Sequence, residues 1–291
     1  MRAVPVAMIL GVCLVATASG PLTASDGRDG RDDRDDGKPY LALGDSVAFG
    51  FMPLPGFEAV NASNFVAYPD YLERALRLTA VNGACPGEAS GSFLDSFAPD
   101  NGCRNYRAQL PLHVAFDGEQ GDFAVEFLKA NRQTRLVTIQ LGANDLFLLR
   151  DRCFGVPSCI QQILPFTLAI LEQNILTTIA NLRATGYRRT IVLVNYFPLD
   201  VNDQQGTGLI VALNAALADA ANRGGVIVAD TFAAFSRVVS TSVPPLSSCR
   251  AGLLKANPAD SITCDVHPSQ TGHQLIASAI VKALRKAEHD H

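Results

Sequence analysis

Short apolar runs alternate with longer amphipathic stretches along most of the chain. The apolar runs predict five strands, at residues 40–43, 79–81, 136–141, 190–196 and 226–229. The amphipathic stretches predict helices at residues 68–78, 123–131, 160–185, 209–222 and 271–288. Because strands and helices alternate without hairpin signals, we predict an α/β fold in which a parallel sheet is covered by helices on both faces.

The first 25 residues do not follow this pattern. Arg2 is followed by an apolar run from Ala3 to Ala18, which ends in small residues. One positive charge, a short apolar segment and an Ala-Thr-Ala cleavage pattern ending at Ala18 are typical of a secretory signal peptide. The run is too short and wrongly flanked for a membrane-spanning helix. We therefore predict that residues 1–25 are a signal peptide.

Residues 26–38 form a strongly polar segment. They contain six Asp, three Arg, one Lys and three Gly, and no apolar residue. Such a segment has no apolar surface whose burial would offset the entropy lost on ordering, so we predict a disordered linker. A calcium loop is disfavoured because Arg residues are interspersed and a bidentate Glu is missing. The remaining residues, 39–291, are predicted to form a single domain.

The cysteines support the prediction of export. The chain has seven, and removing the signal peptide with Cys13 leaves six, an even number that is typical of disulfides in an exported protein. Several pairings are possible, and we favour pairing of consecutive cysteines because each pair then brackets one loop rich in Gly, Pro or Asn. The predicted disulfides are Cys85–Cys103, Cys153–Cys159 and Cys249–Cys264. No CxxC spacing is present, so no metal site is predicted.

Charge excludes one class of partner. The chain has 24 Lys and Arg against 28 Asp and Glu, a formal net charge of −4, and no basic stripe. Nucleic-acid binding is therefore not expected.

Four polar blocks stand out at the ends of predicted strands and before the last helix. They are GDS at 44–46, NGACPGE at 82–88, GAND at 142–145 and DVHP at 265–268. In a parallel sheet, functional residues gather on the loops at the carboxyl ends of the strands. We therefore expect these blocks to lie close together.

In this order, the blocks resemble the SGNH/GDSL hydrolase superfamily of serine esterases and lipases. The matching residues are Ser46, Gly87, Asn144 and His267, and ACPGE with paired loop cysteines is most similar to the secreted bacterial branch. The resemblance implies a three-layer α/β/α sandwich with a five-stranded flavodoxin-like sheet, and no cofactor or metal. It also implies that Ser46 is the nucleophile and His267 its base. The implied oxyanion hole consists of the backbone N–H groups of Ser46 and Gly87 and the side chain of Asn144.

The third member of the catalytic triad departs from the family pattern. The superfamily usually places an Asp three residues before the His, where this chain has Cys264, while Asp265 is only two residues before His267. On a short extended loop, side chains at these two spacings point in different directions. Two hypotheses follow: either Asp265 orients His267, or a backbone carbonyl near Cys264 does so and the enzyme works as a Ser–His dyad.

Apolar residues in two inserted loops, at about 50–64 and 145–164, bear on the substrate. They are Phe49, Phe51, Met52, Leu54, Phe57, Leu146, Phe147, Leu148, Phe154 and Ile160. Such residues favour an apolar cleft for an acyl chain, and the chain has no Trp to stack on a sugar ring. The leading hypothesis is a secreted lipase or esterase.

The alternatives are a carbohydrate O-acetylesterase of the same superfamily or an exported binding domain without activity. The presence of all four motif residues argues against the second alternative. We expect a monomer in the extracellular space or periplasm. Its partner is expected to be a small-molecule or lipid ester, with at most transient contact to a lipid surface.

Overall fold

The computed structural model describes residues 36–53, 56–241, 247–257 and 260–289. The predicted signal peptide and most of the predicted linker lie outside the described residues. The described residues belong to one compact unit.

A five-stranded parallel sheet forms the centre of this unit. Its strands are β1 (Pro39–Gly44), β2 (Thr79–Asn82), β3 (Leu136–Gln140), β4 (Thr190–Val194) and β5 (Ile227–Ala229), in the order β2-β1-β3-β4-β5. The register places Leu41 of β1 between Val81 of β2 and Val137 of β3. The predicted fold class is confirmed, and each predicted strand is present with its ends shifted by at most two residues.

The central strands are buried on both faces. Every residue of β3 is buried, as are all but the first residues of β1 and β4. This explains why the strands have continuous apolar runs such as LVTIQ and TIVLV, since helices cover both faces of a parallel sheet.

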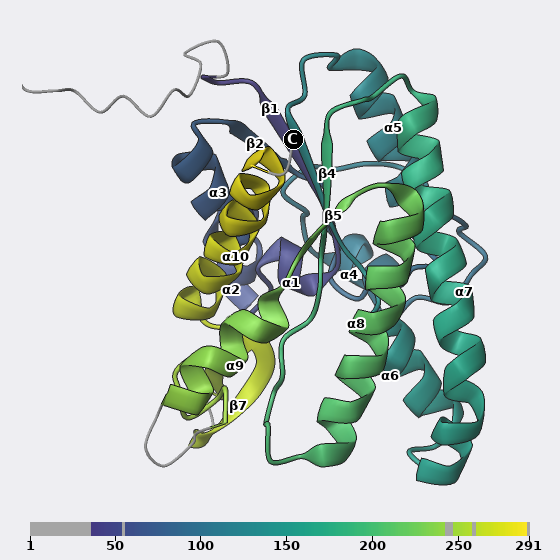
Figure 1. Ribbon diagram of the computed structural model, residues 1–291, viewed down its shortest axis with the longest axis vertical. Helices are drawn as coiled ribbons and strands as arrows, with labels where there is room; N and C mark the ends of the chain where they lie inside the picture. Colours follow the sequence, from purple (N-terminus) through teal and green to yellow (C-terminus); the bar gives the residue numbers. More distant parts are fainter. Residues whose placement is uncertain (1–35, 54–55, 242–246, 258–259, 290–291) are drawn as a thin grey trace, which may run out of the picture. The chain divides into compact units, whose positions relative to one another are not determined.

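Ten helices surround the sheet within the described residues. The longer ones are α3 (Tyr68–Leu76), α5 (Gln120–Ala130), α6 (Ala143–Arg152), α7 (Pro157–Ala184), α8 (Gln204–Gly224), α9 (Thr231–Thr241) and α10 (Gln270–His289). The short ones are α1 (Ser46–Phe49), α2 (Gly56–Ala59) and α4 (Cys103–Gln109), together with the 3-10 turn Ala62–Asn64. Figure 1 shows α3, α9 and α10 on one side of the sheet and α5, α7 and α8 on the other. The layers are therefore α/β/α.

One prediction about the sheet was wrong. A two-stranded antiparallel hairpin, β6 (Leu254–Asn257) and β7 (Asp260–Pro268), occupies a region that we expected to be a loop without hairpin character. β7 contains two Asp and one Pro, which are depleted in strands, but its residues from Ser261 to His267 alternate between polar and apolar, which is a strand pattern that we missed. Pairing with β6 supplies the backbone hydrogen bonds that hold it extended.

The six cysteines outside the first 25 residues form three disulfides between consecutive cysteines. Cys85–Cys103 connects the loop after β2 to the start of α4, and Cys153–Cys159 connects the end of α6 to the start of α7. Cys249–Cys264 connects a turn to β7, one residue before Asp265. Three disulfides are typical of a protein that folds outside the cytoplasm.

Helix α7 is unusually apolar. Among the described helices it is the one that is long and apolar enough to cross a membrane, with a mean hydropathy of 1.4 over an 18-residue window. One such helix is weak evidence for a membrane span, because helices of globular proteins pass the same test. In this fold α7 packs against α5, α6 and α8.

Candidate active site

The four polar blocks converge at the carboxyl ends of the strands. Ser46, Gly87, Asn144 and His267 all line one pocket of about 570 Å³. These residues come from the ends of β1, β2 and β3 and from β7, so the parallel topology brings together positions that are far apart in sequence.

A sharp turn after β1 presents Ser46 to this pocket. Gly44 has φ +142°, and a Cβ there would lie 2.3 Å from the carbonyl oxygen of Gln140, so a side chain has no room. The next residue, Asp45, accepts a hydrogen bond from the backbone N–H of Val47 at 2.9 Å and caps α1. Together, the glycine and the cap fix the direction in which Ser46 leaves the strand.

Asp45 supports this turn and is fully buried. Its other carboxylate oxygen accepts a hydrogen bond from the hydroxyl of Tyr196 at 2.5 Å. Burial raises the pKa of Asp45 to about 6, and the hydrogen bonds from Tyr196 and Val47 oppose that rise. Tyr196 follows β4 and lines the pocket, but the sequence pattern did not single it out.

The loop after β2 approaches the same pocket through Gly87. Its φ is +86°, and a Cβ would lie 2.4 Å from the carbonyl oxygen of Asn101. Asn101 closes this loop by donating its backbone N–H to the carbonyl oxygen of Gly87 at 2.8 Å. The close contact requires glycine at this position and leaves the backbone of Gly87 facing the pocket.

Asn144 is buried in the first turn of α6 and is held by three neighbours. Its Nδ2 donates to the carbonyl oxygen of Glu88 at 2.9 Å, and its Oδ1 accepts from Nδ2 of Asn101 at 2.8 Å. The same Nδ2 donates a long hydrogen bond to Oδ2 of Asp45 at 3.5 Å. Over the described part of the chain, neither Ser46 nor Gly87 uses its backbone N–H in a hydrogen bond. Two free N–H groups and an oriented amide therefore line one pocket, which suits the stabilisation of a developing oxyanion.

His267 lies on β7 with Asp265 beside it. Residues two apart on a strand face the same side, and the carboxylate of Asp265 contacts Nδ1 of His267. The same carboxylate also accepts the backbone N–H of His267 at 2.9 Å. The hydrogen bond with His267 holds the pKa of Asp265 below its usual range. The structure thus brings Asp265 to the imidazole.

An apolar wall surrounds the polar groups. Its apolar members include Phe51, Tyr106, Leu110, Phe147, Phe197, Leu199, Ile210 and Val266. Phe51 also packs edge-on against the ring of His267, with 5.0 Å between ring centroids. The wall is built from the first inserted loop, α4, α6, the segment after β4, α8 and β7.

Only some of the apolar residues that we expected in this wall line the pocket. Phe51 and Phe147 line the pocket, whereas Phe49, Met52 and Ile160 are buried in the core. Phe57 and Phe154 are 79% and 93% exposed and do not line it, and Leu54 lies outside the described residues. Periodicity could not separate these cases, because core and cleft use the same apolar side chains.

The comparison with known families agrees with this geometry. A model of the GDSL-like lipase/acylhydrolase family matches residues 42–275, which is most of the chain. The chain belongs to this family. A comparison with curated proteins finds no match.

Solved structures similar to this GDSL hydrolase are esterases and hydrolases. Axe2, an acetylxylan esterase from Geobacillus stearothermophilus, is 21% identical with a TM-score of 0.51, covering 86% of this chain and 95% of that chain. A catalytic mutant of Axe2 is 19% identical with a TM-score of 0.55 at the same coverage. LAE5, an α/β hydrolase from the metagenome of Lake Arreo, Spain, is 16% identical with a TM-score of 0.54, again covering 86% and 95% of the two chains. At these identities the likeness establishes the fold.

One cluster in the GDSL hydrolase has the composition of a metal site. Cys85, Glu88 and Cys103 are buried with their possible ligand atoms close together. Both sulfur atoms are joined in the disulfide, so neither can serve as a thiolate ligand. The donor set therefore does not fit a metal.

Proposed function

We propose that this GDSL hydrolase is a serine esterase that cleaves carboxylic esters with an apolar acyl chain. The observation that supports the proposal is the arrangement around one apolar pocket of Ser46, the His267–Asp265 pair and three hydrogen-bond donors. Ester hydrolysis requires a nucleophile, a base and an oxyanion site within one cavity.

The proposed reaction begins when Oγ of Ser46 attacks the ester carbonyl carbon. His267 takes the hydroxyl proton at Nε2, since its Nδ1 faces Asp265. The carbonyl π electrons move to oxygen, which then receives hydrogen bonds from the backbone N–H groups of Ser46 and Gly87 and from the amide of Asn144. When the tetrahedral intermediate collapses, His267 returns the proton to the departing alcohol.

The acyl group then remains on Ser46 as an ester. Water attacks this ester while His267 removes a proton from the water, and the same three donors receive the second oxyanion. Collapse releases the carboxylic acid and restores the hydroxyl of Ser46. All the protein groups in this cycle belong to the four blocks.

We further propose that Asp265, rather than a backbone carbonyl, orients His267. The contact between its carboxylate and Nδ1 supports this assignment, because an ionised acceptor stabilises the imidazolium that forms during the reaction. In Axe2, variants described as catalytic mutants replace an Asp and a His that are three residues apart. Asp265 and His267 are two residues apart. Because they lie on strand β7, where residues two apart face the same side, the shorter spacing still allows the carboxylate to reach the imidazole.

The apolar wall supports an acyl chain over an acetyl group. An acetyl group fills only a small part of a pocket of about 570 Å³ lined by Phe51, Phe147, Phe197 and Leu199. Burial of each additional methylene contributes about 0.8 kcal/mol. A carbohydrate acetylesterase is the second candidate. It is supported by Axe2, which shares the fold and is described as an esterase of acetylxylan or acetyl-xylooligosaccharide.

A series of p-nitrophenyl esters from acetate to laurate tests the proposal. We expect kcat/KM of the enzyme to rise by roughly threefold to fourfold per added methylene until the pocket is filled, since about 0.8 kcal/mol per methylene corresponds to that factor. The same preparation is assayed in parallel on acetylated xylooligosaccharides.

The outcomes separate the candidates. A preference for acetate and for acetylated sugars over longer esters would favour the carbohydrate acetylesterase. The absence of activity on every ester would contradict the assignment as an esterase.

The oxyanion role of Asn144 gives a second test. We expect Asn144→Ala to lower kcat about 10²- to 10³-fold with little change in KM, because the amide acts on charge that develops only in the transition state. Asn105→Ala serves as the control, since Asn105 also lines the pocket but lies outside the four blocks. Equal effects of the two substitutions would argue against the assignment.

We propose that the enzyme acts outside the cytoplasm. The three disulfides support an oxidising compartment. The apolar segment before Ala18, with its Ala-Thr-Ala end, supplies the export signal in this proposal.

A further inference from the structure

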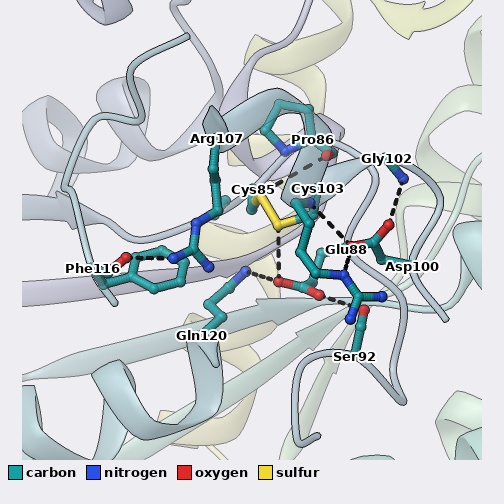
Figure 2. Close-up of a disulfide and its surroundings, with 12 residues drawn as sticks. Cys85, Pro86, Glu88, Ser92, Asp100, Gly102, Cys103, Arg107, Phe116 and Gln120 are labelled. Carbon is teal, nitrogen blue, oxygen red and sulfur yellow. Dashed lines mark hydrogen bonds and ion pairs between the residues drawn. A yellow bond between two sulfur atoms is a disulfide. The ribbon is translucent and has the colours of Figure 1, made fainter. Parts of the chain in front are cut away.

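We propose that Glu88 is a positioning residue that acts as a neutral carboxylic acid and joins the two backbone segments of the oxyanion hole. This inference rests on the proposed esterase function. Glu88 follows Gly87 directly, is 2% exposed and takes no part in the reaction proposed above. Its side chain points toward the Cys85–Cys103 disulfide and Gln120, the first residue of α5 (Figure 2), and Glu88 does not line the pocket that holds Ser46.

One amide connects Glu88 to the turn that presents Ser46. Gln120, the first residue of α5, is fully buried and donates through Nε2 to Oε2 of Glu88 at 3.2 Å. The same amide accepts the backbone N–H of Gly44 at 2.7 Å and donates to the carbonyl oxygen of Gly44 at 3.0 Å. The Gly87 loop and the Gly44–Ser46 turn are therefore joined by the Glu88–Gln120 pair, in addition to the backbone hydrogen bond that Cys85 donates to the carbonyl oxygen of Gly44 at 3.0 Å.

The backbone of Glu88 is also tied to the site. Its carbonyl oxygen accepts a hydrogen bond from the Asn144 amide at 2.9 Å. Glu88 is therefore connected directly to Gly87 and Asn144, and through Gln120 to the turn that presents Ser46. Oε1 of the Glu88 side chain accepts a hydrogen bond from the hydroxyl of Ser92 at 2.5 Å. A shift of the Glu88 side chain would be transmitted to both Gly87 and Asn144.

The contact with the disulfide favours the protonated form of Glu88. Oε2 lies 3.4 Å from Sγ of Cys103. A disulfide sulfur carries no hydrogen, so this contact is a hydrogen bond only when Glu88 is protonated and donates its O–H to the sulfur. Burial raises the pKa of Glu88 to about 7, although the hydrogen bonds from Ser92 and Gln120 favour the ionised form.

The charged neighbours do not neutralise Glu88. Arg104 pairs with Asp100 at 2.7 Å. Arg107 donates to the carbonyl oxygen of Phe116 (Figure 2) and to that of Gly118. Within the described residues, neither arginine forms an ion pair with Glu88. Asp100 disfavours the ionised form of Glu88 and Arg107 favours it. Glu119 also lines the cluster but is not one of the groups that shift the pKa of Glu88.

Ionisation of Glu88 would therefore disturb the oxyanion hole. Above its pKa the O–H donor to sulfur is lost and an unpaired charge stays buried, which favours rearrangement of the loop. Gly87 and Asn144 would then move relative to Ser46. Because a misplacement of about 1 Å can cost about 10²-fold in rate, we expect kcat to fall at least about tenfold as pH rises through about 7.

Glu88→Gln tests the proposal through the pH profile of kcat on a p-nitrophenyl ester. A glutamine is neutral at all pH values and retains an N–H donor for the sulfur. We expect the alkaline fall in kcat seen in the wild type to be absent from Glu88→Gln, with KM unchanged across the range. Glu119→Gln, which removes a carboxylate at the surface of the same cluster, is the matched control and should keep the wild-type profile.

Ser92→Ala provides an independent variant in case Glu88→Gln does not fold. Its hydroxyl favours the ionised form of Glu88, so its removal should raise the pKa of Glu88 and move the alkaline fall to higher pH. A merely structural role for Glu88 would lower activity equally at every pH.

Two results would overturn the proposal. The first is a fall of kcat at alkaline pH that persists unchanged in Glu88→Gln. The second is a fall of kcat that Ser92→Ala does not move to higher pH. A wild type inactive on every ester would instead overturn the proposed function. If the wild type is active and Ser46→Ala is not, unchanged profiles count against the role of Glu88 alone.

Discussion

Replacing Ser46 by Ala is expected to lower kcat about 10⁶-fold on a p-nitrophenyl ester. The reason is that no acyl-enzyme can form, so the two easier steps through a covalent intermediate are lost. Some rate above that in water should remain, because the oxyanion donors still bind the carbonyl oxygen. The measurement is steady-state hydrolysis, combined with intact-protein mass spectrometry after reaction with a p-nitrophenyl alkylphosphonate, which should label the wild type once.

Ser278→Ala is the matched control for this substitution. Ser278 is exposed on α10 and does not line the pocket, so activity and labelling should equal those of the wild type. If Ser46→Ala kept substantial activity or still accepted the phosphonate, the nucleophile would have to be a different residue.

Asp265→Asn is expected to lower kcat about 10⁴-fold while the protein stays folded. The amide introduced at position 265 can donate an N–H to Nδ1 of His267, which favours the tautomer that carries its hydrogen on Nε2. In that tautomer Nε2 cannot accept the proton of Ser46. The carboxylate also stabilises the imidazolium, a contribution that a neutral amide lacks. The hydrogen bond with His267 lowers the pKa of Asp265, so its carboxylate stays ionised at neutral pH and the ionised acceptor for Nδ1 is lost only when the pH falls through that lowered pKa.

The size of this effect decides between the two hypotheses for His267. A loss of only a few-fold would favour orientation by a backbone carbonyl and a Ser–His dyad. Asp219→Asn is a suitable control, because Asp219 is exposed on α8 and does not line the pocket, and it should not change kcat. Circular dichroism of the Asp265 variant would show whether β7 keeps its conformation.

The sheet could be predicted from the sequence because its strands are buried on both faces. Runs such as LVTIQ in β3 and TIVLV in β4 are too continuous for a half-exposed surface, and the helices between them keep an amphipathic period. The hairpin of β6 and β7 could not be predicted in the same way. β6 contains Lys, Ala and Asn, which are depleted in strands, so the partner that β7 needs carries no strand pattern of its own.

The residues of the candidate site that belong to sequence motifs could be predicted, and the others could not. Ser46, Gly87 and Asn144 belong to short motifs that follow strands of the parallel sheet, where the topology already implies proximity, and His267 belongs to the motif before the last helix. Tyr196 and Gln120 carry no such motif. They are identified only by the atoms that they contact, Asp45 for Tyr196 and Gly44 and Glu88 for Gln120.

The sequence by itself determined the five strands of the parallel sheet, the five long amphipathic helices, the family motifs and the even number of cysteines beyond the first 25 residues. These are local properties, set by periodicity, turn chemistry and composition. Only the tertiary structure decided that Asp265 reaches His267, which apolar residues line the pocket and how Glu88 is surrounded. Each of these depends on contacts between segments far apart in the chain or on the pairing of β7, so no pattern within a single segment encodes it.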